Sequence, residues 1–150
     1  MTDSLKIRTG TPADIATVMT FWAEAAEGTD RHDTTEAVTA LVERDPEALL
    51  IAESDGIVVG TLIAGWDGWR ASLYRMAVHP AHRRRGIASS LLAVAEDRFR
   101  GFGAFRVDAM VLDANLDAHR LWAAAGYTAQ DDSSRWVRKM EKGQPLEGSP

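Results

Sequence analysis

The sequence predicts a mixed α/β fold, in which a mostly antiparallel central sheet carries helices on both of its faces. Three observations support this prediction. Segments with the apolar spacing of helices alternate with short segments typical of strands. Three strand-like segments follow one another through tight turns, which favours antiparallel pairing. A long helical segment then joins two strand-like segments, which implies one parallel, right-handed crossover.

The N-terminal part of the chain predicts one strand and two helices. Residues 5–8 alternate apolar and polar side chains, as a short strand does. Thr11 and Pro12 form a capped helix start, and apolar residues then recur at helical spacing until the helix fades near Gly28. A second capped start at residues 33–36 begins a helix that ends near residues 45–46.

The middle of the chain predicts a meander of three strands. Residues 49–52 and 57–64 form a hairpin around the turn Ser54-Asp55-Gly56. The next turn is Trp66-Asp67-Gly68-Trp69, and the third strand covers residues 72–78.

The C-terminal part predicts alternating helices and strands. Residues 86–102 form the longest helix, because apolar residues recur there every four positions: Ile87, Leu91, Ala95 and Phe99. A strand, a helix and two closing strands follow, at residues 105–112, 115–125, 127–129 and 136–140. The polar residues 141–150 are typical of a frayed tail. Residues 1–150 are therefore predicted to form a single domain.

Composition and charge exclude several classes of function. The 150 residues contain no cysteine, which excludes disulfides, thiolate nucleophiles and cysteine metal sites. The net charge of −5 does not suit a general nucleic-acid binder. No histidine pair has metal-ligand spacing, so we expect no metal. The N-terminus lacks the features of a signal peptide and no apolar run could span a bilayer, so we expect a cytoplasmic protein without membrane contact.

The stretch from Arg83 to Ala88 joins a strand end to a helix start, and it is the clearest candidate site. The first turn of a helix has N–H groups without partners and a positive dipole end, which together hold a diphosphate. The small residues Gly86 and Ala88 let phosphate oxygens approach the backbone, and three arginines add positive charge. The alternative is an exposed basic turn. Neither the Walker nor the Rossmann glycine pattern is present.

Two segments resemble the signatures of the GNAT superfamily of N-acetyltransferases. Residues 76–92 (MAVHPAHRRRGIASSLL) are similar to the family's acetyl-CoA-binding segment, of the form Gln/Arg-x-x-Gly-x-Gly/Ala after a strand. Residues 115–127, with Asn115, Leu121, Trp122 and Gly126-Tyr127, resemble its second signature. The resemblance runs from the first strand to Met140 and implies a GNAT-like acyl-CoA N-acyltransferase fold.

The resemblance implies acetyl-CoA as the acyl donor and assigns roles by position. The backbone of Met76, Ala77 and Val78 would pair with the pantetheine arm, and the Val78 N–H would stabilise the oxyanion. Asn115 would hydrogen-bond the pantetheine, and Trp122 would lie near the cofactor sulfur. The pyrophosphate would be bound by the following loop and helix start: Arg83, Arg84, Arg85, Gly86, Ile87, Ala88 and Ser89.

Two positions depart from the family. Many members have a tyrosine acid where Trp122 stands, and some have a glutamate base where Ser72 stands. Tyr74 and Asp67 are candidate catalytic replacements, although Tyr74 also suits a packed strand aromatic and Asp67 a turn residue. By strand alternation, Tyr74 is predicted to share its face with Ser72 and Met76. Further candidates lie where the family builds its substrate site: Glu24, Glu27, Asp30 and His32.

The resulting hypothesis is an acetyl-CoA-dependent N-acetyltransferase in which a primary amine attacks the thioester directly. The acceptor would be a small molecule, a peptide N-terminus or a lysine, and the acidic residues favour a cationic one. The two departures motivate an alternative, a catalytically degenerate CoA-binding sensor or interaction module. Trp66 and Trp69 suit either hairpin packing or a cation–π floor for the amine. The sequence is compatible with a homodimer through the terminal strands.

Overall fold

The computed structural model describes residues 4–25 and 34–140. They belong to two compact units, one from Met1 to Leu112 and the other from Asp113 to Pro150. The single domain that the sequence predicts over residues 1–150 stays a prediction. In the part of the chain described, no helix combines the length and the apolar character that crossing a bilayer requires.

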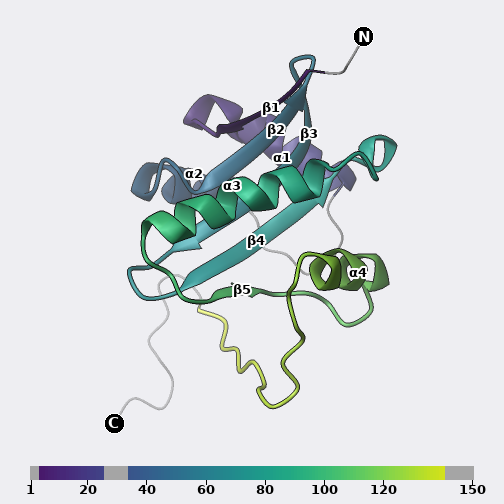
Figure 1. The fold of residues 1–150 in the computed structure, drawn as a ribbon. Coiled ribbons are helices and arrows are strands. Elements are labelled where there is room, and N and C mark those ends of the chain that lie inside the picture. The colour runs from purple at the N-terminus through teal and green to yellow at the C-terminus, as the bar shows by residue number, and fades with distance from the viewer. Residues whose placement is uncertain (1–3, 26–33, 141–150) are drawn as a thin grey trace. The chain divides into compact units, whose positions relative to one another are not determined.

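The first unit is built on a five-stranded sheet whose strands lie side by side in the order of the sequence (Figure 1). Its strands are β1 (Leu5–Thr9), β2 (Leu49–Ser54), β3 (Ile57–Trp66), β4 (Ala71–Val78) and β5 (Val107–Ala109). The first four pair antiparallel, and β4 pairs with β5 in parallel. The predicted mixed, mostly antiparallel sheet with one parallel connection is confirmed.

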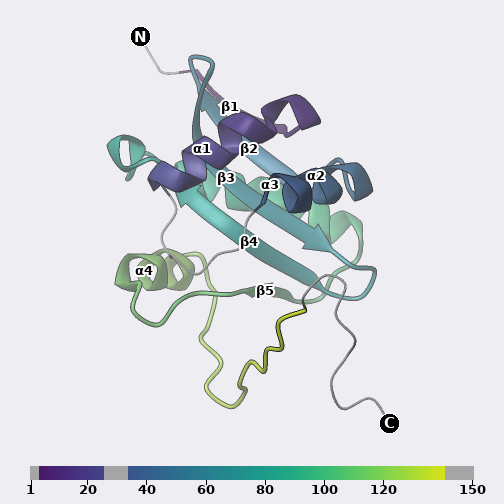
Figure 2. The ribbon, with the colours of Figure 1, turned by 180° about the vertical axis from the view of Figure 1, so that it is seen from behind.

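Helices cover both faces of this sheet, as predicted. A 3₁₀ turn η1 (Pro12–Asp14) leads into α1 (Ile15–Ala25), which lies with α2 (Thr35–Arg44) on one face (Figure 2). Helix α3 (Ile87–Gly101) covers the other face, after a second 3₁₀ turn η2 (Pro80–His82) (Figure 1). The antiparallel strands are thus buried between two layers of helices.

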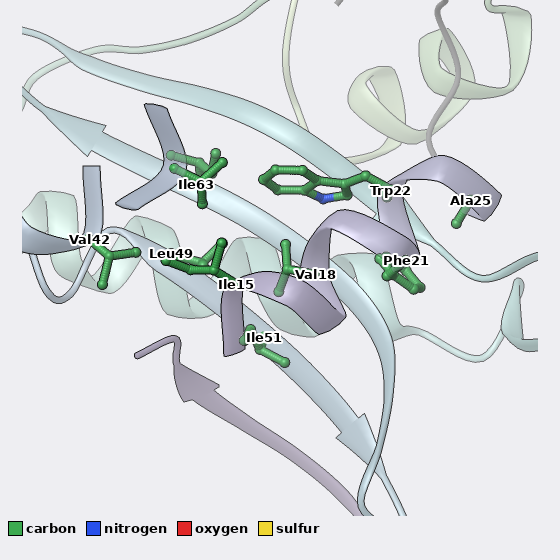
Figure 3. Packing of buried hydrophobic residues seen from close by; sticks show 11 residues of the cluster. Ile15, Val18, Phe21, Trp22, Ala25, Val42, Leu49, Ile51 and Ile63 are labelled. Carbon is green, nitrogen blue, oxygen red and sulfur yellow. The ribbon is translucent and has the colours of Figure 1, made fainter. Parts of the chain in front are cut away.

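The apolar spacing of the helices is what attaches them to the sheet. Helix α1 buries a stripe against β2 and β3, visible in Figure 3: Ile15, Val18, Phe21, Trp22 and Ala25. Helix α3 buries the predicted series Ile87, Leu91, Ala95 and Phe99. Burial of apolar area contributes roughly 25 cal/mol per Å², so these two stripes hold both layers in place.

The predicted element ends need small adjustments. Thr34 caps α2, since its hydroxyl accepts the Ala37 N–H at 3.0 Å. The predicted end of the first helix near Gly28, Asp33 in the second capped start and the frayed tail at 141–150 lie outside the described residues.

The closing strands predicted at 127–129 and 136–140 are wrong, because neither segment pairs as a strand within the described chain. The strand predicted at 105–112 is shortened to β5, three residues long. Strand propensity describes a side chain's fit to a pleated, half-buried surface, and it forms no strand without a pairing partner. The apolar residues of 136–140 carried propensity, and nothing in the sequence specified their partner.

Among its described residues, the second unit has one helix, α4 (Leu116–Ala124), as predicted. Asn115 caps it, because its side-chain oxygen accepts the Ala118 N–H at 3.0 Å. The chain then turns at Gly126, and the Tyr127 N–H donates to the Trp122 carbonyl at 2.9 Å.

Candidate active site

Strand β4 contains a bulge at the point where the candidate site begins. Thr61 pairs with Ala77 and Ile63 pairs with Tyr74, so two steps along β3 face three steps along β4. The extra residue is accommodated at Arg75, which has a left-handed φ of 56°. A bulge of this kind bends the strand and shifts the alternation of its side chains.

The shift changes which β4 side chains share a face. Ile63 and Thr61 are two residues apart on β3, so their side chains lie on the same face of the sheet, toward α1 and α2. Their partners on β4, Tyr74 and Ala77, therefore face the same way. Ser72 lies on this face with Tyr74, as predicted from alternation. The prediction that Met76 also shares this face is wrong, since alternation resumes out of step after the bulge.

Beyond the bulge, the outer edge of β4 is open. Strand β5 pairs only with residues 71–73, and residues 74–78 have no strand on that side within the described chain. The His79 N–H donates to the Val59 carbonyl at 2.9 Å. Since successive backbone groups of a strand point to opposite sides, the N–H and C=O of Val78 point away from β3, toward the open edge.

The loop before α3 lies against this open edge. The Arg83 Nε donates to the Val78 carbonyl at 3.3 Å, which joins the loop to the strand end. Two residues of the loop have left-handed backbone, Arg84 with φ 64° and Gly86 with φ 79°. Such alternation of backbone conformation makes a concavity of N–H groups that binds anions.

The start of α3 supplies further free donors. The cap residue Gly86 has no side chain to accept a hydrogen bond, and the first helical bond runs from the Ser90 N–H to the Gly86 carbonyl at 3.0 Å. The N–H groups of Ile87, Ala88 and Ser89 have no acceptor among the described residues. Together with the exposed side chains of Arg83 to Arg85, they form a positive site that fits a diphosphate.

Asp67 lies in the β3–β4 turn with its carboxylate engaged. Its Oδ1 accepts the N–H of Arg70 at 2.6 Å and of Trp69 at 2.7 Å. These hydrogen bonds, that from Arg70 first, lower the pKa of Asp67 below its ordinary value. At about 3.3 Å per residue, the eight residues of β4 separate this turn from Val78 by more than about 20 Å. The structure does not bring Asp67 and Val78 together.

Tyr74 lies nearer to the open edge and is half exposed, at 53%. Its ring rests over Gly65, where an added Cβ would lie 3.3 Å from the ring. Val78 lies four positions further along the strand, about 13 Å away. Its phenol is therefore accessible on the α1 side of the sheet, although the ring also has the packing role that the sequence left open.

The two tryptophans of the turn differ in packing and exposure. Trp66 stacks on Phe102, at the C-terminal end of α3, with ring centroids 5.2 Å apart and planes 4° apart, which favours a packing role for Trp66. Trp69 is 75% exposed.

A groove of about 450 Å³ runs beside α1, close to the end of β4. Its lining combines polar residues of α1 with the start of β3 and the residue that follows Val78, and includes Thr17, Thr20, Phe21, Glu24, Val58 and His79. Of the acidic candidates for substrate binding, Glu24 thus lies in a groove. Glu27, Asp30 and His32 lie outside the described residues.

A polar cluster at the bulge, formed by Trp22, Thr61 and Arg75, was not predicted from the sequence. The Trp22 indole N–H donates to the Thr61 hydroxyl at 2.8 Å, and that hydroxyl donates to the Arg75 carbonyl at 3.0 Å. The Arg75 guanidinium lies 5.2 Å from the Trp22 ring centroid. The only available signal was a threonine inside an otherwise apolar strand.

Asn115 and Trp122 belong to the second unit and are described within it. The Asn115 side-chain oxygen is used for the cap of α4, and its amide NH₂ has no partner among the described residues. The Trp122 ring meets Tyr127 edge-on, with centroids 5.0 Å apart. Their predicted roles toward the loop at 83–89 stay predictions.

Comparison with known proteins assigns the chain to a family. The matching family model, described as the acetyltransferase (GNAT) family, covers residues 15–127. An acetyltransferase of Pectobacterium atrosepticum is 32% identical over 111 residues, 74% of this chain and 79% of its own. An N-acetyltransferase of Yersinia pestis, described as uncharacterised, is 29% identical over 127 residues, 85% of this chain and 90% of its own.

A solved structure gives the same result. The yncA protein of Salmonella typhimurium, solved with its cofactor acetyl-CoA, aligns with a TM-score of 0.69 and 26% identity, over 84% of this chain and 80% of that one. The family-model match at residues 15–127 includes the residues that form the open edge and the positive loop. The chain belongs to the acetyltransferase (GNAT) family.

Proposed function

We propose that this protein transfers an acetyl group from acetyl-CoA to a primary amine by direct attack of the amine on the thioester. One observation carries the proposal. The open edge of β4 at Val78 is joined by Arg83 to a loop and helix start rich in unpaired N–H groups. A strand edge that can pair with an extended chain therefore continues into a site that fits a diphosphate.

Acetyl-CoA has the two features that this arrangement would recognise. Its pyrophosphate would bind the N–H groups and arginines of residues 83–89. Its pantetheine arm would lie along β4 and exchange hydrogen bonds with the backbone of Met76 and Val78, with Ala77 between them. The acetyl-CoA bound to yncA supports this assignment. For Asn115 and Trp122, the roles toward the pantetheine and the sulfur come from the family resemblance alone.

The Val78 N–H would stabilise the transition state. When the amine nitrogen attacks the carbonyl carbon, a C–N bond forms and negative charge develops on the carbonyl oxygen. An N–H held in place by the strand stabilises that charge without the reorganisation that water requires. The C–S bond then breaks, CoA leaves as a thiolate, and the amine nitrogen loses a proton to solvent or to a nearby base.

The proton-transfer groups differ from those common in the family. Trp122 has no ionisable proton, and the Asp67 carboxylate is engaged in its turn. Tyr74 is the exposed acid on β4 that faces α1, so we assign it the proton exchange, through water across the distance to Val78. A thiolate leaves without a strong acid, and most of the acceleration would come from holding amine and thioester together.

A cationic amine suits the acceptor side. The protein has a net charge of −5, and Glu24 lines the groove beside α1 and His79. A carboxylate in such a groove attracts an ammonium group, which must lose a proton before it attacks. The groove supports small amines and the flexible ends of peptides or lysines as acceptors.

A thiol-release assay with a broad amine panel tests the proposal, together with calorimetric measurement of acetyl-CoA binding. We expect binding and release of CoA with at least one class of cationic amine. Binding without turnover on any amine, and without self-acetylation, would instead favour the CoA-binding sensor. A protein that fails to bind acetyl-CoA would overturn both.

A further inference from the structure

The bulge in β4 is held by a buried relay of hydrogen bonds that begins on α1. An indole N–H only donates, so the Thr61 oxygen accepts from Trp22 at 2.8 Å. The Thr61 hydroxyl proton is thereby left for the Arg75 carbonyl, at 3.0 Å. Thr61 is 0% exposed and Trp22 is buried, so water does not replace either bond.

The relay ends on the residue with the least favourable backbone in the strand. Arg75 has a φ of 56°, a conformation that residues with a Cβ rarely adopt. Its guanidinium also lies 5.2 Å from the Trp22 ring centroid, a cation–π contact with the same side chain that begins the relay. Contacts from both α1 and β3 therefore meet on this residue.

We propose that Trp22 and Thr61 are positioning residues that hold the β4 bulge, and through it the direction of the Val78 N–H. The register before the bulge is set by Tyr74 on Ile63, and the register after it by Ala77 on Thr61. Loss of the extra residue at Arg75 would shift every backbone group after it by one position. The N–H at Val78 would then turn from the open edge toward β3.

This inference rests on the proposed function for its catalytic part, because it concerns where an oxyanion donor points. Thr61→Val is the decisive variant, since it keeps the shape of the side chain and removes the hydroxyl that bonds both the Trp22 N–H and the Arg75 carbonyl. We expect a fall in kcat of about ten- to a hundredfold, as for a displacement of about 1 Å. The KM for acetyl-CoA should change less than about twofold, because the pyrophosphate loop is untouched.

Three further variants separate positioning from packing. Thr61→Ser keeps the hydroxyl and should restore kcat to near the wild-type value. Trp22→Phe removes the N–H donor together with part of the buried ring, leaves the Thr61–Arg75 bond, and should give an intermediate kcat. Val42→Ala removes two methyl groups from α2 in the same buried cluster, away from the bulge, and should lower stability without changing kcat.

Hydrogen exchange of the Trp22 indole N–H, followed by NMR in the unliganded protein, tests the relay without any substrate. We expect slow exchange in the wild type and in Thr61→Ser, and fast exchange in Thr61→Val. Fast exchange in Thr61→Val with unchanged kcat would overturn the positioning role while the proposed function stands. Absence of turnover in the wild type would contradict the proposed function and leave the relay standing. Indole exchange in Thr61→Val as slow as in the wild type would overturn the relay, whether or not the wild type turns over an amine.

Discussion

The Asp67 carboxylate accepts two backbone N–H groups in the β3–β4 turn, and both bonds favour its ionised form. Asn at this position keeps an oxygen that can accept the same bonds. We therefore expect Asp67→Asn to leave the turnover of the amine unchanged in the thiol-release assay. A general base would lose its function in this variant, so a fall in kcat beyond about tenfold would restore Asp67 to the catalytic residues.

The same carboxylate gives a prediction for pH dependence. The pKa of Asp67 is lower in the folded protein than its ordinary value of 3.8. The turn therefore contributes stability above about pH 4, and this stability is lost as pH falls through the lowered pKa. Thermal unfolding of the wild type and of Asp67→Asn between pH 7 and pH 2.5 should show a shallower acid decline in the variant. Parallel declines in both proteins would contradict this role.

Tyr74 offers a second test at the scale of one residue. Tyr74→Phe keeps the ring that covers Gly65 and removes only the phenol. If the phenol exchanges protons with the reacting groups, kcat falls by about tenfold or more, and the Kd for acetyl-CoA stays the same. An unchanged kcat at every pH would leave Tyr74 with its packing role alone.

At the scale of elements, structure set by local patterns could be predicted from the sequence, and structure set by contacts between distant segments could not. The apolar series of α3 was predicted residue by residue, and α1 was predicted from apolar residues at helical spacing, because helical hydrogen bonds and spacing are local. The loop before α3 and its unpaired N–H groups were predictable for the same reason, since they belong to one helix start, and their role toward a phosphate stays a prediction. The bulge at Arg75 was not, because a left-handed arginine has no signal in composition and depends on Trp22 and Thr61 from distant segments.

The left-handed cap of α3 leads to a prediction with a matched control. Gly86 and Gly56 have the same φ of 79°, and an added Cβ meets nothing within 4 Å at either position. Alanine at either site should cost about 1 kcal/mol of stability, because the left-handed conformation is strained. Only Gly86→Ala should also weaken acetyl-CoA binding, measured by calorimetry. Equal Kd values for the two variants would contradict the placement of the pyrophosphate at α3.

At the scale of the whole molecule, two features of opposite sign meet at the site. The protein carries a net charge of −5, and acetyl-CoA is itself a polyanion. The three exposed arginines at 83–85 must therefore offset a repulsion that extends over the molecule. The contrast between the net negative charge and the local arginines could be predicted from the sequence, because charges are counted without a fold. Their position beside unpaired N–H groups and the open edge of β4 could not, because it depends on the fold.

Salt separates the two contributions. The Debye length is about 10 Å at 0.1 M salt, so added salt screens both the attraction at the loop and the repulsion from the rest of the protein. In the wild type the nearby attraction should dominate, and the Kd for acetyl-CoA should rise with salt. Replacing Arg83, Arg84 and Arg85 by Gln changes the net charge from −5 to −8, three charges lower. We expect this variant to bind more weakly, with a Kd that falls as salt rises, because mainly repulsion remains to be screened. A salt dependence as steep as that of the wild type would place the phosphates of acetyl-CoA away from this loop.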